Sequence, residues 1–271
     1  MQKCLQFLSQ GEIVSLQITD LYPYYLLYPK LTEKHISRYM YQYLAKYNLL
    51  HDAQSGFRSN HYCQIALVNI IDKWIEEINN GNDNVVILLD LKKAFDVVDH
   101  DIIAKKLEIY GFNKKALALF NSYMTNRTQQ VQIENALSDK CPVKYGEPQG
   151  SILDPLLFLL YKNDLPLSIS NCNTDMYADD STIHISGGNI SDIQTKFQED
   201  LNRIELLCKD NNMFINCNKT KCMTVGTKQK LAFQNEELSL TINSEQLQHS
   251  TGEKLLGIKI DSILNWKNQI D

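Results

Sequence analysis

The chain has 271 residues, of which 44% are hydrophobic and 22% are charged, and its formal net charge is −5. This composition excludes a disordered chain, and the 11 glycines and 6 prolines exclude a collagen-like or low-complexity one. The longest clean apolar run covers residues 156–161, far short of the roughly 20 residues that a membrane-spanning helix needs. We therefore expect no membrane partner.

Two further features indicate the compartment. The first ten residues, MQKCLQFLSQ, lack the apolar core and cleavage site of a secretory signal. The seven cysteines show no zinc-binding spacing, which favours thiols in a reducing compartment. We expect an intracellular protein of the cytoplasm or nucleus that is not secreted.

Helical periodicity is clear in four segments. Apolar residues recur at helical spacing in residues 31–47, 62–81, 102–112 and 191–207. Gly81 and Gly111 stand where helix C-termini favour glycine, Asp99 and Asp101 are suited to capping a helix start, and Ser191 with Gln194 is a plausible capping box.

Strands are expected between these helices. VVILL at 85–89 is typical of a strand covered on both faces, and 129–133 with 141–145 suggests an antiparallel pair. Residues 174–186 suggest a strand, an acidic turn and a second strand, and LLGIKID at 255–261 suggests another strand. Without strict alternation of strand and helix, the pattern favours an α+β fold with an antiparallel sheet in one continuous domain.

Three carboxylates stand at strand ends. Asp90 ends the strand at 85–89, and Asp179 with Asp180 occupies the acidic turn. Each is ordinary turn composition when taken alone. If the strands are neighbours in one sheet, the three carboxylates meet and repel one another unless cations neutralise them, and hard oxygen ligands select Mg²⁺ or Mn²⁺. Two such ions would activate a hydroxyl and stabilise a leaving phosphate oxygen.

Several sequence blocks add a family resemblance. LLDLKKAFDVVDHDIIAKKLEIYGF, GEPQGSILDPLLFLLYKNDLP, YADDSTIHISG, INCNKTKCM and LLGIKIDSILNWK follow in this order, after NLLHDAQSGFR. Over about residues 21–266, the chain resembles the reverse transcriptase of non-LTR (LINE-type, jockey-like) retrotransposons. The resemblance implies a palm, in which helices back an antiparallel sheet, together with fingers and a thumb that is largely absent.

The same resemblance implies a domain organisation. Residues 1–20 are poorly matched, and residues 21–271 form a single reverse transcriptase domain. Within it, the fingers cover about 21–84 and 113–145, the palm about 85–112 and 146–260, and the start of the thumb 261–271. With so little thumb to hold the duplex, we expect low processivity.

The resemblance also implies catalytic roles. The function would be RNA-directed DNA polymerisation, with an RNA template, a DNA primer and dNTPs as partners. Asp90, Asp179 and Asp180 match the residues that hold two Mg²⁺ (or Mn²⁺) ions. Lys219 matches the residue that protonates the pyrophosphate leaving group, with Lys221 as the fallback.

Substrate contacts follow from the same match. Phe95 falls where an aromatic residue excludes the 2′-hydroxyl of a ribonucleotide, although a core phenylalanine is an equally good interpretation. Gln149 and Gly150 match residues beside the incoming nucleotide, and Arg58 matches a template or triphosphate contact. Leu256 and Gly257 match the primer-grip strand of the family.

Some residues depart from the family pattern. Tyr22 stands where an arginine is usual, Glu147 where an aliphatic residue is usual, and Asp154 where a glycine is usual. These departures leave an alternative open, namely an inactive, truncated relic that folds and binds nucleic acid without polymerising. A different palm-type enzyme, such as a nucleotide cyclase, is disfavoured by the PQG, KTK and LLGIKID blocks.

Overall fold

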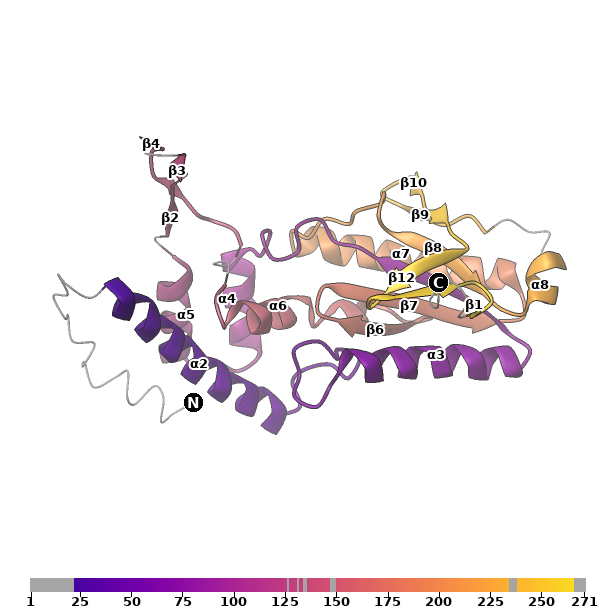
Figure 1. Ribbon diagram of the computed structural model, residues 1–271, viewed down its shortest axis with the longest axis horizontal. Coiled ribbons are helices and arrows are strands. Elements are labelled where there is room, and N and C mark those ends of the chain that lie inside the picture. The colour runs from indigo at the N-terminus through magenta and orange to yellow at the C-terminus, as the bar shows by residue number, and fades with distance from the viewer. Residues whose placement is uncertain are drawn as a thin grey trace. The chain divides into compact units, whose positions relative to one another are not determined.

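The computed structural model describes residues 22–125, 127–130, 132–133, 136–146, 150–233 and 238–265. The chain forms two compact units that alternate along the sequence (Figure 1). The first unit comprises residues up to 50 and residues 95–162, and the second comprises residues 51–94 and 163–271. None of the helices in these described ranges is long and apolar enough to cross a membrane. The boundaries of fingers, palm and thumb remain a prediction.

The first unit is mainly helical. It contains α2 (Tyr22–Lys46), α4 (His100–Ile109), α5 (Lys114–Met124) and α6 (Asp154–Lys162). Asp99 caps α4 as expected, because its side chain accepts the backbone N–H of Asp101 at 2.9 Å. The apolar run at 156–161 forms the buried part of α6.

Short hairpins complete the first unit. Strand β2 (Thr128–Gln129) pairs with β5 (Cys141–Pro142), which confirms the expected antiparallel pair in a shorter form. A second hairpin joins β3 (Gln132–Ile133) to β4 (Ala136–Leu137).

The second unit is built on a five-stranded sheet in the order β11-β8-β1-β7-β6. Its strands are β1 (Asp83–Leu89), β6 (Asn173–Tyr177), β7 (Asp180–Gly187), β8 (Lys221–Val225) and β11 (Gln248–His249). All neighbouring strands are antiparallel except β11 and β8. The expected mixed fold with an antiparallel sheet is therefore confirmed.

Strand β1 is the middle strand of the sheet, and both of its faces are apolar. Val85, Val86 and Ile87 are each 0% exposed, as expected for a strand covered on both sides. Figure 1 shows α3 (Cys63–Asn79) along one face of the sheet and α7 (Ile190–Asp210) along the other. The remaining elements of this unit are η1 (Leu165–Ser168), α8 (Lys228–Phe233), β9 (Thr241–Ile242) and β10 (Glu245–Gln246).

The expected single strand at 255–261 is wrong. The structure has a hairpin of β12 (Gly252–Leu255) and β13 (Ile258–Asp261). Leu256 and Gly257, with φ of 48° and 90°, form its turn. Two successive left-handed residues reverse the chain in the sense that suits a twisted hairpin, which the alternating pattern of LLGIKID does not reveal. The hairpin packs on the α3 side of the sheet, in a cluster with Trp74.

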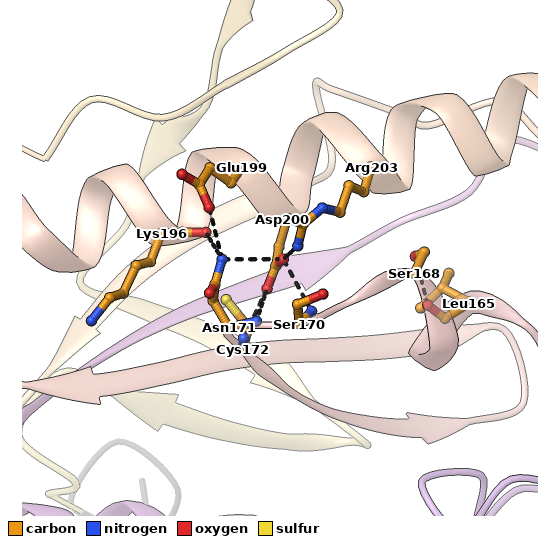
Figure 2. A network of polar contacts seen from close by, with 9 residues as sticks. All are labelled: Leu165, Ser168, Ser170, Asn171, Cys172, Lys196, Glu199, Asp200 and Arg203. Carbon is orange, nitrogen blue, oxygen red and sulfur yellow. Dashed lines mark hydrogen bonds and ion pairs between the residues drawn. The ribbon is translucent and has the colours of Figure 1, made fainter.

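A buried aspartate fixes the loop that leads into β6 (Figure 2). Asp200 of α7 is 0% exposed, and its carboxylate accepts the backbone N–H groups of Ser170, Asn171 and Cys172 at 3.1, 2.7 and 2.8 Å. Arg203 adds an ion pair at 2.7 Å. Burial, with the nearby negative charge of Asp200, raises the pKa of the Cys172 thiol. Helix α7 thereby fixes the start of β6.

Candidate active site

The acidic turn lies in a tight hairpin. Strands β6 and β7 are joined so that Tyr177 pairs with Asp180, leaving Ala178 and Asp179 in the turn. Ala178 has φ of 57°, a left-handed conformation that is uncommon for a residue with a side chain. Both aspartates are exposed. The expected strand, acidic turn and strand are confirmed.

Asp90 lies at the same end of the sheet as this turn. In the antiparallel register of β1 and β7, Leu88 pairs with Thr182 and Leu89 pairs with Ser181. The pairing ends there, and continuing the register by one residue would set Asp90 opposite Asp180. The backbone therefore brings the ends of the two neighbouring strands together, as the sequence predicts.

The backbone around Asp90 is held on both sides. Its N–H donates to Thr220 Oγ1 at 3.2 Å, and its carbonyl oxygen accepts the N–H of Asn216 at 2.8 Å. The next residue, Leu91, forms an isolated antiparallel bridge with Ile215. These contacts fix the segment that carries the carboxylate without using the carboxylate itself.

The same loop carries the two candidate lysines. Lys219 is exposed, and its backbone N–H donates to the carbonyl of Asn216 at 3.1 Å. The Lys221 ammonium donates to the carbonyl of Asn218 at 2.8 Å and also contacts Gln248. Because the Lys221 ammonium, at the start of β8, is already bonded to Asn218 and Gln248, Lys219 stays the first candidate proton donor.

The chemistry of the aspartates suits a hard divalent cation, because their donors are carboxylate oxygens. In the part of the chain that the structure describes, however, no three His, Cys, Asp or Glu side chains are gathered closely enough to hold a metal ion. The strand ends are adjacent, but their carboxylates do not form a ligand cluster. A metal centre at Asp90, Asp179 and Asp180 thus remains a prediction.

A cavity of about 370 Å³ lies beside the acidic turn. Asp180 and Thr182 of β7 line it, together with Lys73 of α3, Asp175 of β6 and Leu256 of the β12–β13 turn. One candidate metal ligand and one candidate primer-grip residue therefore face the same space.

Sequence reasoning missed a polar network in the wall of this cavity. Asp175 accepts the Lys73 ammonium at 2.8 Å and lies 3.0 Å from Nε2 of the buried His184. Burial alone would raise the pKa of Asp175, but the contacts with His184 and Lys73 lower it below its ordinary value. No signal in the sequence indicated it, because in a strand that alternates apolar and polar residues a histidine between two isoleucines is expected to face solvent.

Arg58, a candidate substrate contact, is used within its own loop. Its Nη1 donates to the carbonyls of His51 and Gln54 at 3.2 and 3.0 Å. Because this guanidinium nitrogen already has backbone acceptors, the geometry gives Arg58 a loop-stabilising role.

Other candidate contacts belong to the first unit. Phe95 is half-buried and stacks on Phe158, with ring centroids 4.4 Å apart, as a core phenylalanine would. Gly150 is exposed with φ of 85°, so a left-handed backbone accounts for glycine there. Gln149 and Glu147 lie outside the described residues. None of these observations tests the roles that the resemblance implies.

Helices on both faces of an antiparallel sheet, with aspartates at the ends of neighbouring strands, define a polymerase palm-like fold. A family model described as "Reverse transcriptase (RNA-dependent DNA polymerase)" matches residues 26–260. The chain belongs to this reverse transcriptase family.

Relatives narrow the family further. The chain is 26% identical over 224 residues to the RNA-directed DNA polymerase from mobile element jockey of Drosophila melanogaster, a match covering 80% of this chain and 24% of that protein. It is also 26% identical over 246 residues to a probable RNA-directed DNA polymerase from transposon BS of the same species, covering 88% of this chain and 26% of that protein. The resemblance to jockey-like non-LTR elements is confirmed, and the chain spans about a quarter of these relatives.

Solved structures share the fold. Telomerase from Candida tropicalis, in complex with a fragment of telomeric RNA, superposes with a TM-score of 0.60 at 14% identity, covering 89% of this chain and 38% of that one. The apo enzyme truncated from its C-terminal domain gives a TM-score of 0.55 at 14% identity, covering 87% and 45%. At this identity, the likeness establishes the fold alone.

Proposed function

We propose that the chain is an RNA-directed DNA polymerase domain of a non-LTR retrotransposon, which extends a DNA primer along an RNA template with dNTPs. One observation carries the proposal: β1 and β7 are neighbouring antiparallel strands, and their register, which is paired up to Leu89 and Ser181, would set Asp90 opposite Asp180 if it continued by one residue. This occurs in a chain whose family match runs from residue 26 to 260. The relatives described above are RNA-directed DNA polymerases, which supports the same activity.

The chemistry would be nucleotidyl transfer. The primer 3′-oxygen forms a bond to the α-phosphorus of the dNTP. The bond between that phosphorus and the oxygen that bridges to the β-phosphate breaks, so pyrophosphate leaves, and the 3′-hydroxyl proton goes to solvent. Asp90, Asp179 and Asp180 would hold Mg²⁺ or Mn²⁺, which when bound lowers the pKa of the 3′-hydroxyl and neutralises triphosphate charge. Exposed Lys219, on the loop that fixes Asp90, would give a proton to the departing pyrophosphate.

Substrate positions follow from the cavity beside the acidic turn. Asp180 and Leu256 line the same space, which supports a primer terminus lying there with its 3′-hydroxyl near the strand ends. Phe95 would exclude ribonucleotides, and Gln149 and Gly150 would contact the nucleotide. Because Arg58 is engaged by its own loop, we assign it to holding that loop.

An active domain is favoured over an inactive relic. The family match is continuous, and the strand ends that carry the aspartates are held by backbone hydrogen bonds. A copy that is no longer under selection accumulates substitutions at buried and exposed positions alike. Here the central strand keeps its buried apolar residues.

Primer extension tests the proposal directly. The purified chain, supplied with an RNA template, a DNA primer, dNTPs and Mg²⁺, should extend the primer. Asp90→Asn should reduce extension by about 100-fold or more while retaining primer–template binding, because it removes a metal-binding charge. Asp210→Asn makes the same charge change at an exposed site of the second unit and should leave extension unchanged. A folded chain that never extends the primer, or an undiminished Asp90→Asn variant, would contradict the proposal.

We also propose that the protein resides in a reducing intracellular compartment. The structure describes six of the cysteines, and none of those forms a disulfide. Thiols of this number persist where the environment is reducing. Alkylation of the protein in denaturant without a reducing agent, directly after cell lysis, should label these cysteines and tests this point.

A further inference from the structure

The turn that carries the acidic pair is held by a residue far away in the chain. Gln54 is 1% exposed and lies in the loop before α3. Its Oε1 accepts the N–H of Ala178 at 3.1 Å, and its Nε2 lies 3.5 Å from the Ala178 carbonyl oxygen. One carboxamide therefore faces both polar groups of the residue that precedes Asp179.

The backbone of the same loop pairs with β6, the edge strand of the sheet. The N–H of Ser55 donates to the carbonyl of Met176 at 2.8 Å, and the N–H of Met176 donates to the carbonyl of Ala53 at 2.7 Å. These bonds form a parallel bridge between Gln54 and Met176. The side chain of Gln54 continues this pairing past the last residues of the strand and into the turn.

Gly56 permits the close approach. A Cβ atom added to Gly56 would lie 2.1 Å from the backbone nitrogen of Ala178, closer than any real contact of this type. The N–H of Gly56 also donates to Gln54 Oε1, at 2.7 Å. The carboxamide oxygen of Gln54 therefore accepts two backbone N–H groups in a buried position. Because buried polar groups need hydrogen-bond partners, these bonds favour a single orientation of the Gln54 side chain.

The contact with Gln54 affects the backbone conformation of Ala178. A left-handed φ of 57° is unfavourable for alanine, so the turn needs support from its surroundings to persist. The carboxamide supplies that support from one side. If it is lost, Ala178 can relax to negative φ, and the direction in which Asp179 and Asp180 project changes with it.

We propose that Gln54 is a positioning residue that holds the Ala178 peptide so that Asp179 and Asp180 present their carboxylates to divalent metal. The inference rests on the proposed polymerase function and adds to it a residue other than the three candidate aspartates. Gln54 acts through the turn, because its buried carboxamide is bonded to the backbone of Ala178 and Gly56.

The fold offers a matched control. Gln198 of α7 makes the same two-point contact with a backbone elsewhere, since its Oε1 accepts the N–H of Thr241 and its Nε2 donates to the carbonyl of Thr241, both at 2.9 Å. Gln198→Ala removes this pair, together with contacts to Asn202 Oδ1 and the Thr241 hydroxyl, without touching the acidic turn. Any loss that is only structural should appear equally in both variants.

The first measurement is the Mg²⁺ concentration that gives half-maximal primer extension. Gln54→Ala should raise it by about tenfold, the factor expected for losing one to two buried hydrogen bonds, while primer–template affinity stays unchanged. Gln198→Ala should not raise it. Adding Ala178→Gly to Gln54→Ala should recover part of the loss, because glycine adopts the left-handed turn without strain. An equal Mg²⁺ requirement in both single variants, or no recovery in the double variant, would overturn the proposal.

A second measurement does not depend on activity. Hydrogen exchange of the Ala178 amide should accelerate in Gln54→Ala relative to the amides of β1, and should be unchanged in Gln198→Ala. If the parental chain fails to extend primers, the proposed function fails, yet this exchange result still tests the contact. Unchanged exchange at Ala178 in Gln54→Ala would refute the role of Gln54 even in an active polymerase.

Discussion

Replacing Asp154 by asparagine should make the protein more stable at neutral and alkaline pH. Asp154 is the first residue of α6 and is 8% exposed. Burial raises the pKa of its carboxyl group from 3.8 to about 6, with hydrogen bonds from Ser151 opposing the rise and the charge of Glu33 adding to it. Burial outweighs the usual benefit of an acidic residue in the first turn of a helix.

The size of the effect follows from linkage. The gap between 3.8 and about 6 corresponds to at most about 3 kcal/mol of folding free energy. The folded state binds its proton more tightly than the unfolded chain, so this contribution is fully present below pH 3.8 and is lost as the pH rises through about 6. The charged carboxylate therefore weakens the fold above that pH.

Thermal unfolding of Asp154→Asn and the parental chain at pH 8 and at pH 4 measures this contribution. The variant should have the higher Tm by several degrees at pH 8, and the difference should shrink to near zero at pH 4. Asp139→Asn removes the same charge from an exposed site of the same unit and should show little difference at either pH. A gain in Tm that is equal at both pH values, or no gain at pH 8, would refute the reasoning.

Other predictions concern the fold, the sugar gate and the leaving group. Asp200→Asn should lower stability by about 2–4 kcal/mol in denaturant unfolding, because an amide nitrogen cannot accept the loop N–H groups, whereas Arg203→Ala at the exposed partner should cost far less. Phe95→Val should increase ribonucleotide incorporation in primer extension; if sugar selectivity stays unchanged, its packing role is the whole of its function. Lys219→Ala should slow nucleotide addition more than Lys221→Ala does, and the reverse order would assign the proton to Lys221.

Local patterns explain which elements the sequence could predict. The helices at 62–81 and 191–207 and the hairpin around Asp179 depend on periodicity and turn composition that lie within a single segment. Helix α5 was missed although its buried residues Ala116, Phe120 and Met124 recur at four-residue spacing after the cap Asn113. The apolar residues Leu117, Ala118 and Leu119 between Ala116 and Phe120 obscured this spacing.

Long-range polar contacts explain what the sequence could not predict. The sequence predicted that the strands ending near Asp90 and Asp180 are neighbours in one sheet, and β1 and β7 are paired. Gln54 contacts a residue 124 positions away, and Asp200 holds a loop about 30 positions away. Nothing in the neighbourhood of either residue in the sequence specifies such partners, since a polar side chain can satisfy its hydrogen bonds in many places.

The central place of β1 in the sheet affects how the chain folds during synthesis. Val85 pairs with Ile185 on one side and with Thr224 on the other, so the ribosome makes the middle strand long before either neighbour. During that interval, an apolar strand has two open edges, a state that invites aggregation and chaperone binding. The candidate site can assemble only after the last of these strands emerges from the ribosome.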